Sequence, residues 1–452
     1  MQSQHEDTPL RAAGSTRALS GAWLALGVAA LAVAGVFAVL LVAARAPGSS
    51  ALFADQDFFQ IALVIHVDQS VLIWFLAFTG ILWTLGSRIH EQRPALGWSA
   101  FALAGAGAGL MAVSPLFGAG DPSLNNYVPV LRHPVFHASL LLFGLGIVMQ
   151  VLVYGAGQNP RHLWPDPIRI GIYTAAVATL VTVGSLAWTW WALDIPAHTE
   201  AYFEILFWGG GHVLQFAYTQ VMLVAWIWLA RMAGMRIPVS DRWLSALLIL
   251  GIVPLLTVPL IHGLYAVESA GSRTAFTQLM QFGNGVAAVP IGLLILFALT
   301  GARDVAPRHL PAAHRALLAS LLLFAVGGVL GVMIGDVNTV ITAHYHGSIV
   351  GVTLALMGLA YALLPTLGWA PATGRLARIQ PVLYGAGQLV HILGLAISGM
   401  MGIERKTAGE AQQLDGLTQF FMGIMGLGGV LAVIGGILFV VVIALSFLRR
   451  PR

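Results

Sequence analysis

The stretch NTVITAHYHGSIVG, residues 338–351, is the most informative part of this chain. It places His344 and His346 two residues apart within an otherwise apolar helix. On an α-helix such residues point about 200° away from each other, so the two imidazoles leave the helix on nearly opposite sides. An unpaired polar group is costly in an apolar environment. Each ring therefore needs a partner of its own, and no single bulky partner serves both.

The composition indicates a membrane protein. Apolar residues make up 58% and charged residues 9% of the 452 residues, and the mean hydropathy is +0.84. The absence of cysteine excludes disulfides, thiolate metal sites and iron–sulfur clusters. No basic cluster stands apart from the loops, so nucleic-acid binding is not expected. We predict an all-α polytopic fold whose twelve membrane-spanning helices lie at residues 20–44, 58–86, 97–118, 134–156, 168–193, 203–230, 243–266, 275–301, 314–335, 338–366, 377–400 and 417–448.

The basic residues predict the orientation of these spans. With the N-terminus inside, 17 of the 22 lysines and arginines fall in inner segments and the other 5 in outer ones. Because positive charge gathers on the cytoplasmic side, both termini are predicted to be cytoplasmic, in the inner membrane of a bacterium. We predict residues 1–19 as a cytoplasmic tail, 20–448 as a single twelve-helix membrane domain and 449–452 as a second cytoplasmic tail.

Six histidines from five spans fall at one depth on this map. At 1.5 Å per residue they lie roughly 6–14 Å below the outer surface. Imidazole is the commonest metal ligand and the usual heme ligand. A shared depth favours a cofactor site over hydrogen-bonded packing residues, and two hemes, one on each side of the 338–351 helix, satisfy its two rings. The six are His66, His212, His262, His344, His346 and His391.

The pattern resembles subunit I of the heme-copper oxidase superfamily over nearly the whole chain. Residues 338–346 are similar to the family's signature around its paired heme ligands. FWGGGH, residues 207–212, is similar to the aromatic segment before its first non-heme metal ligand, and the fifty-residue step to His262 also fits. QLVHILGL, residues 388–395, is similar to the end of span 11, after which basic residues meet heme propionates.

The resemblance implies a heme enzyme with two hemes, expected to be b-type, and one non-heme metal, iron or copper. His66 and His346 are then the ligands of a low-spin heme that only transfers electrons. His344 is the ligand of a high-spin heme whose open face binds a diatomic gas. His212 and His262 hold the non-heme metal, which acts as a Lewis acid.

The resemblance also implies partners. Arg405 and Lys406 are expected to pair with heme propionates by charge-assisted hydrogen bonds, ordinary solvated loop charges being the alternative. The sequence shows no cupredoxin or cytochrome c motif, so we expect an electron-donating second subunit of the cupredoxin or cytochrome c type on the outer face. Membrane lipid and a diatomic gas complete the expected partners.

Span 7 departs from the family pattern. The family usually has two adjacent histidines there, whereas this chain has Ile261, His262 and Gly263. A two-histidine site is weak for copper and needs a further donor. Oxygen donors near the same depth are Gln215, Tyr218, Tyr265, Glu268 and Gln278. Glu268 is the only carboxylate on or near span 7, although helical geometry puts it above His262, near the surface.

The position of the tyrosine near the metal site also differs from the usual family pattern. Familiar oxygen-reducing members have a tyrosine four residues after the span-6 histidine, where this chain has Phe216. Another branch has its tyrosine in span 7, and Tyr265 resembles that arrangement. A tyrosine beside heme and metal supplies an electron and a proton for O–O cleavage. An interfacial aromatic anchor is the alternative interpretation of Tyr265.

The third departure from the family pattern concerns proton uptake. Oxygen-reducing members that pump protons take them from the cytoplasm through buried carboxylates or a lysine, whereas we place none of the 18 acidic residues of this chain in the inner half of a span. Protons are therefore predicted to enter from outside, which suits a nitric oxide reductase that joins two NO molecules into N2O. Reduction of O2 to water, as by a cytochrome c oxidase, remains the main alternative. A twelve-helix proton-coupled transporter and a degenerate subunit that kept only the low-spin heme also remain open.

Overall fold

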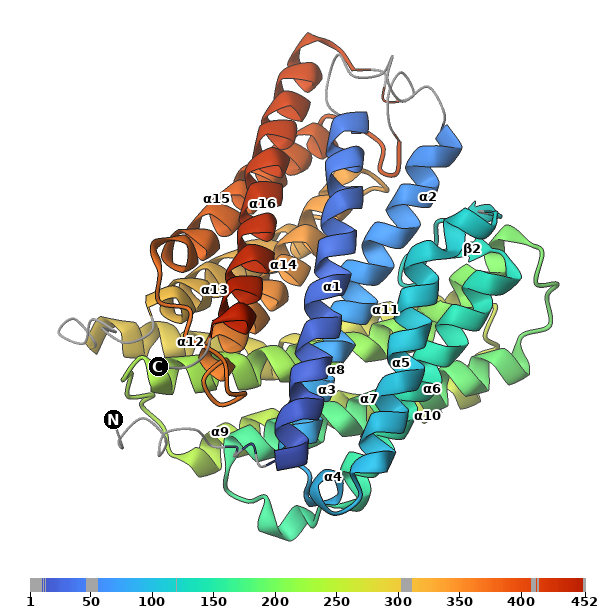
Figure 1. The fold of residues 1–452 in the computed structure, drawn as a ribbon. Coiled ribbons are helices and arrows are strands. Elements are labelled where there is room, and N and C mark those ends of the chain that lie inside the picture. Colours follow the sequence, from blue (N-terminus) through green and yellow to red (C-terminus); the bar gives the residue numbers. More distant parts are fainter. Residues whose placement is uncertain are drawn as a thin grey trace. The chain divides into compact units, whose positions relative to one another are not determined.

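The computed structural model describes residues 10, 12, 14–45, 56–118, 120–301, 311–407, 412 and 414–449 (Figure 1). The described chain forms two compact units. Unit 1 comprises residues up to 27 together with residues 75–306, and unit 2 comprises residues 28–74 together with residues from 307 onward. The parts of the predicted tails outside the described ranges have no structural description, and the single domain over 20–448 stays a prediction.

The predicted all-α, twelve-span architecture is confirmed. Within the described residues, twelve helical segments are long and apolar enough to cross a membrane. Each coincides with a predicted span to within a few residues at most ends. The segments are Gly14–Ala44, Phe58–Leu85, Pro94–Phe117, Pro134–Ala156, Pro167–Ala192, Glu200–Met232, Asp241–Leu264, Ala270–Thr300, Pro311–Val332, Thr339–Leu363, Arg375–Met400 and Gly416–Leu448.

Unit 1 is built from antiparallel helix pairs whose ends carry clear sequence signals. Asp166 caps the helix that follows it by accepting hydrogen bonds from the backbone of Ile168 and Arg169, and Pro167 occupies its first position. A short antiparallel ribbon pairs Asp121 with Arg132 in the loop before α6. The elements are α3 (Trp74–Leu85), α4 (Arg88–Gln92), α5 (Pro94–Val113), β1 (Asp121–Ser123), β2 (Val130–Arg132), α6 (Pro134–Ala156), α7 (Pro167–Ala192), α8 (Glu200–Met232), α9 (Asp241–Leu250), α10 (Val258–Leu264), α11 (Ala270–Gly283) and α12 (Gly285–Gly301).

Span 7 of this unit is broken where its prolines fall. Residues Val253–Thr257 form a short 3₁₀ segment between α9 and α10, with Pro254 in its first turn and Pro259 in the first turn of α10. Proline lacks the amide that an α-helix interior needs, so the helix is interrupted there. The break leaves His262 on the short helix α10.

Unit 2 contains the C-terminal four helices, coloured orange to red in Figure 1, and the second half of α1 with α2. α13 packs on α14 and α15 packs on α16. Gly428 lets α16 approach α15 closely, because a Cβ there would lie 2.2 Å from the backbone nitrogen of His391. The bounds are α1 (Gly14–Arg45), α2 (Gln56–Val67), α13 (Pro311–Val332), α14 (Thr339–Leu363), α15 (Arg375–Met400) and α16 (Gly416–Leu448).

Candidate functional site

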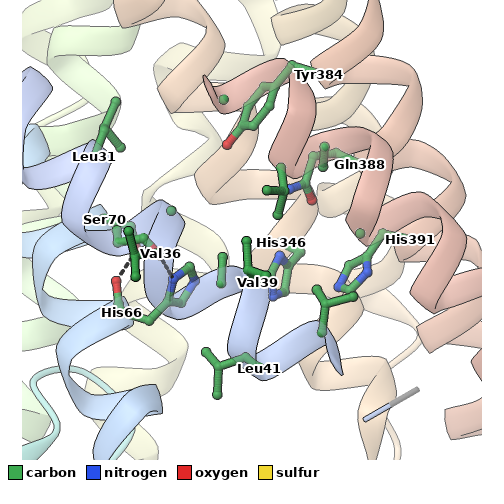
Figure 2. Close-up of a pocket in the computed structure, with 18 of the residues that line it drawn as sticks. Leu31, Val36, Val39, Leu41, His66, Ser70, His346, Tyr384, Gln388 and His391 are labelled. Carbon is green, nitrogen blue, oxygen red and sulfur yellow. Dashed lines mark hydrogen bonds between the residues drawn. The ribbon is translucent and has the colours of Figure 1, made fainter. Parts of the chain in front are cut away.

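A largely apolar cavity in unit 2 brings three of the predicted site residues together. It has a volume of about 340 Å³, within the range of ligand pockets. His66 of α2 and His346 of α14 both line it, and Lys406 lines it from the loop after α15. Figure 2 shows the imidazoles of His66 and His346 directed into this space, with Gln388 on another wall. The Oε1 atom of Gln388 is buried and makes no hydrogen bond to the described part of the chain.

The ring of His66 is oriented by a hydrogen bond. Its Nδ1 lies 2.9 Å from the carbonyl oxygen of Ala34 on α1. Because a carbonyl only accepts, Nδ1 carries the proton and Nε2 keeps its lone pair. This is the arrangement that orients metal-binding histidines in general. The helix continues beyond His66 as a π-helical segment, Asp68–Ile73, and the Oγ of Ser70 donates to the carbonyl oxygen of His66.

His346 has a second histidine beside it. The ring centroids of His346 and His391 lie 5.0 Å apart, and both residues line the cavity (Figure 2). His391, on α15, directs its Nδ1 to the carbonyl oxygen of Met425 at 2.9 Å. Three of the six histidines singled out in the sequence, His66, His346 and His391, therefore line one cavity.

Lys406 has an unusual backbone. Its φ is 62°, in the left-handed region that costs a non-glycine residue roughly 1–2 kcal/mol. The segment before it pairs with the start of α14, where Thr339 donates its amide to Ile403 at 3.0 Å. This pairing holds Lys406 at the cavity. Arg405 is half-buried next to it and is not among the residues that line the cavity.

His344 leaves α14 toward a different neighbour, as its spacing from His346 leads us to expect. Its Nδ1 lies 2.7 Å from the carbonyl oxygen of Gly327 on α13, so this ring too has its Nε2 lone pair available. The ring fits against α13 because Gly331 has no side chain, and a Cβ there would lie 2.7 Å from the His344 Nδ1.

His212, in unit 1, is hydrogen-bonded to the phenol of a tyrosine, Tyr127. Its Nδ1 donates to the carbonyl oxygen of Trp208 at 2.7 Å, and its Nε2 therefore accepts from the phenol of Tyr127 at 2.8 Å. The two ring centroids are 4.6 Å apart. His212 is 1% exposed, so this pair is shielded from solvent.

His262 is buried on α10 in the same unit. Its Nε2 lies 2.9 Å from the Oγ of Ser185 on α7, and Trp188 stacks on its ring with centroids 5.6 Å apart. The Nδ1 atom of His262 is buried and has no hydrogen-bond partner in the described ranges. A buried nitrogen without a partner is a free donor for a metal once Nε2 carries the proton.

The candidates Tyr265, Glu268 and Gln215 lie in unit 1, and none of the hydrogen bonds or ring contacts found among the described residues joins them to His212 or His262. Tyr265 is 43% exposed, and its ring lies against Gly271. Glu268 accepts a hydrogen bond from the amide of Asp194 at 3.0 Å, which engages one carboxylate oxygen in a surface loop. Gln215 is half-buried on α8. Their predicted roles stay predictions.

Sequence reasoning missed Tyr127 and Ser185, which contact the two histidines directly. Tyr127 is 85 residues from His212 in the chain, and Ser185 is 77 from His262. The triple glycine before His212 was the one local signal, since glycines on a membrane helix mark a place where another group approaches closely.

The twelve long apolar helices define a multi-pass membrane protein. Residues 18–431 match the family described as cytochrome c and quinol oxidase polypeptide I, so the chain belongs to this family of membrane oxidoreductases. Its members generally bind hemes and a metal and work with other subunits in lipid.

Two relatives resemble the chain over most of its length. An uncharacterized protein of Rickettsia prowazekii (strain Madrid E) is 29% identical over 497 aligned residues, covering 93% of this chain and 94% of the relative. An uncharacterized protein of Aquifex aeolicus (strain VF5) is 28% identical over 360 residues, covering 79% of this chain and 88% of the relative.

Proposed function

We propose that this chain is the catalytic subunit of a respiratory terminal reductase that converts two NO molecules, two electrons and two protons into N2O and water. The observation that carries the proposal is the cavity of unit 2, lined by His66, His346 and Lys406. Two imidazoles with an apolar wall and one ammonium group match the two faces and the propionate edge of a bis-histidine heme.

The residues fit the groups that the family implies. The orientation of His66 by Ala34 and of His344 by Gly327 leaves an Nε2 lone pair on each ring for iron. When bound, the hemes supply one-electron transfer and a site for the gas, and the metal supplies Lewis acidity. The chain itself fixes the rings, shields the site from water and places positive charge near the propionates.

Nitric oxide is the preferred substrate for two reasons. Phe216, four residues after His212, is a buried core residue without a hydroxyl group. The inner halves of the predicted spans carry no carboxylate for proton uptake from the cytoplasm. Reduction of O2 is the second candidate, because the phenol of Tyr127 lies beside His212 and a phenol near the site is what O–O cleavage requires.

Electrons are proposed to come from a cupredoxin or cytochrome c subunit on the outer face. The position of Lys406 supports this proposal. Lys406 lines the cavity from the segment after α15, and the span that contains α15 is predicted to end on the outer side of the membrane. Both hemes are proposed to be b-type and the non-heme metal to be iron or copper.

The test is consumption of each gas by the purified, heme-loaded complex with an artificial electron donor. NO consumption with N2O formation and little O2 consumption is expected. A turnover ratio that favours O2 contradicts the nitric oxide assignment and supports the second candidate. A preparation without heme absorbance contradicts both and favours a transporter. If His262→Ala leaves the non-heme metal content unchanged, the metal site itself is refuted.

A further inference from the structure

We propose that the hydroxyl group of Thr342 binds a propionate of the low-spin heme, together with Lys406. The inference rests on the proposed function, which puts that heme between His66 and His346. Thr342 lies on α14, about one helical turn before His346, and both residues line the unit 2 cavity. Thr342 adds an uncharged hydrogen-bond donor to the positive charge that Lys406 brings to the same cavity.

The hydroxyl group of Thr342 is buried without a partner. Thr342 is 4% exposed, and its Oγ1 makes no hydrogen bond to any of the described residues. A buried hydroxyl group that stays unpaired is costly, and most such groups in folded proteins have a partner. A ligand that brings an acceptor atom into the cavity supplies the partner that Thr342 lacks.

Thr342 differs in this respect from other threonines inside the helices of this chain. A threonine hydroxyl on a helix can bond to the carbonyl oxygen three or four residues earlier. Thr79, Thr84 and Thr179 make this bond, at 2.7, 2.7 and 2.9 Å. Thr342 has the same opportunity at Asn338, four residues earlier, and its Oγ1 does not take it. The hydroxyl group therefore remains available to a group in the cavity.

Backbone pairing brings Thr342 and Lys406 to the same end of the cavity. At the start of α14, Thr339 donates its amide to the carbonyl oxygen of Ile403 at 3.0 Å. Thr342 follows Thr339 by three residues, and Lys406 follows Ile403 by three. A hydroxyl donor and an ammonium group that border one space suit a carboxylate, because charge-assisted hydrogen bonds are stronger than neutral ones.

The place of Thr342 along α14 also suits a propionate. At 1.5 Å per residue, Thr342 lies about 6 Å nearer than His346 to the predicted outer end of the span. Residues four apart share one face of a helix, so the hydroxyl group and the imidazole border the same space. The edge of a heme held by His346 that faces Lys406 is therefore also the edge that faces Thr342.

The two side chains act differently on a carboxylate. The ammonium group of Lys406 is a point charge at the end of a flexible stem. Thr342 is β-branched, so its hydroxyl group has few orientations on a helix and defines the direction of the bond that it donates. Thr342 is thus a positioning residue, which fixes the orientation of the heme in the cavity without any transfer of a proton.

Gln388 offers a comparison within the same cavity. It lines the cavity, and its Oε1 is also buried without a partner in the described part of the chain (Figure 2). Gln388 lies on α15, three residues farther than His391 from the predicted outer end, whereas Thr342 lies on the outer side of the histidines. A b-type heme has only carbon substituents away from its propionates. Removal of the Gln388 amide should therefore leave the propionates unaffected.

The experiment compares Thr342→Val with Thr342→Ser in the purified heme-loaded complex. Valine keeps the branched shape without the hydroxyl group, whereas serine keeps the hydroxyl group. The matched controls are Gln388→Leu and Thr353→Val, the latter at a buried threonine of α14 that is not among the residues lining the cavity. Propionate vibrations are measured by redox-induced infrared difference spectroscopy with heme labelled with ¹³C in its carboxyl groups. Heme retention is measured as the rate at which low-spin heme is lost to excess apomyoglobin.

Thr342→Val is expected to shift a propionate band and to speed loss of the low-spin heme by about 10–100-fold, the effect of one hydrogen bond to a charged group. Thr342→Ser, Thr353→Val and Gln388→Leu should keep the propionate bands of the parent protein. Unchanged bands and loss rate in Thr342→Val overturn the inference alone. The same follows if Thr342→Ser behaves like Thr342→Val, because the effect then comes from packing. A complex without low-spin heme overturns the proposed function, and the inference with it.

Discussion

At the scale of single residues, two neighbouring histidines that line the unit 2 cavity are both able to serve as a ligand of the proposed low-spin heme. His346 and His391 lie 5.0 Å apart, and the resemblance assigns the low-spin heme to His346 only. The Nδ1 of His391 lies 2.9 Å from the carbonyl oxygen of Met425, which orients its ring. His346→Ala should remove the low-spin heme spectrum, and His391→Ala should retain it, as should the exposed-site control His137→Ala. If His391→Ala loses the low-spin heme spectrum and His346→Ala retains it, His391 and not His346 is the heme ligand.

Lys406 carries a second prediction at this scale. Lys406 lines the cavity, and a positive charge there would stabilise the reduced, more negative state of the proposed low-spin heme. Lys406→Gly removes that charge while it relieves the left-handed backbone, so the fold should be retained or improved. The midpoint potential of the low-spin heme should fall by on the order of 50 mV, roughly 1.2 kcal/mol. A redox titration measures this shift, and an unchanged potential would mean that Lys406 is an ordinary loop charge.

At the scale of elements, α13 and α14 approach each other closely at several glycines, and Gly327 is one of them. A Cβ at Gly327 would lie 2.4 Å from the backbone nitrogen of Ser348, whereas a Cβ at the adjacent Gly328 meets nothing within 4 Å. Gly327→Ala must push the helices apart and shift the carbonyl group that orients His344. We expect a loss of about 1–3 kcal/mol of stability and altered CO binding by the high-spin heme, with Gly328→Ala as the silent control. Equal melting temperatures and CO spectra for the two variants would falsify this contact.

Elements were predictable from sequence to different degrees. The twelve spans follow from hydropathy because a bilayer demands long apolar helices, and the break in span 7 falls at Pro254 and Pro259, which lack the amide of a continuous helix. The divergence of His344 and His346 follows from helical periodicity alone. The π-helical turn after His66 had no local signal, because it depends on how the rest of unit 2 packs.

The least predictable contacts, at the scale of the whole molecule, join residues far apart in the chain. The Tyr127–His212 and Ser185–His262 pairs are set by tertiary packing, which spacing rules do not encode. The oxygen donors considered from the sequence, Gln215, Tyr218, Tyr265, Glu268 and Gln278, all lie on or next to spans 6, 7 and 8. The phenol that contacts His212, that of Tyr127, comes instead from the loop before α6.

The side from which protons enter is likewise a property of the whole molecule. If electrons and protons both come from the outer face, turnover moves no net charge across the bilayer. The acidic groups agree with this, because Asp68 is fully buried in the predicted outer half of its span, while Asp241, at the predicted inner end of another, is engaged by Arg231 at 2.6 Å. NO turnover by the complex in sealed vesicles, driven by an external donor, should therefore generate no membrane potential, and an uncoupler should not change its rate. A potential-sensitive dye that responds during turnover, with acceleration by the uncoupler, would show that protons cross from the inside and would require a path through the serines, threonines and water of the inner half.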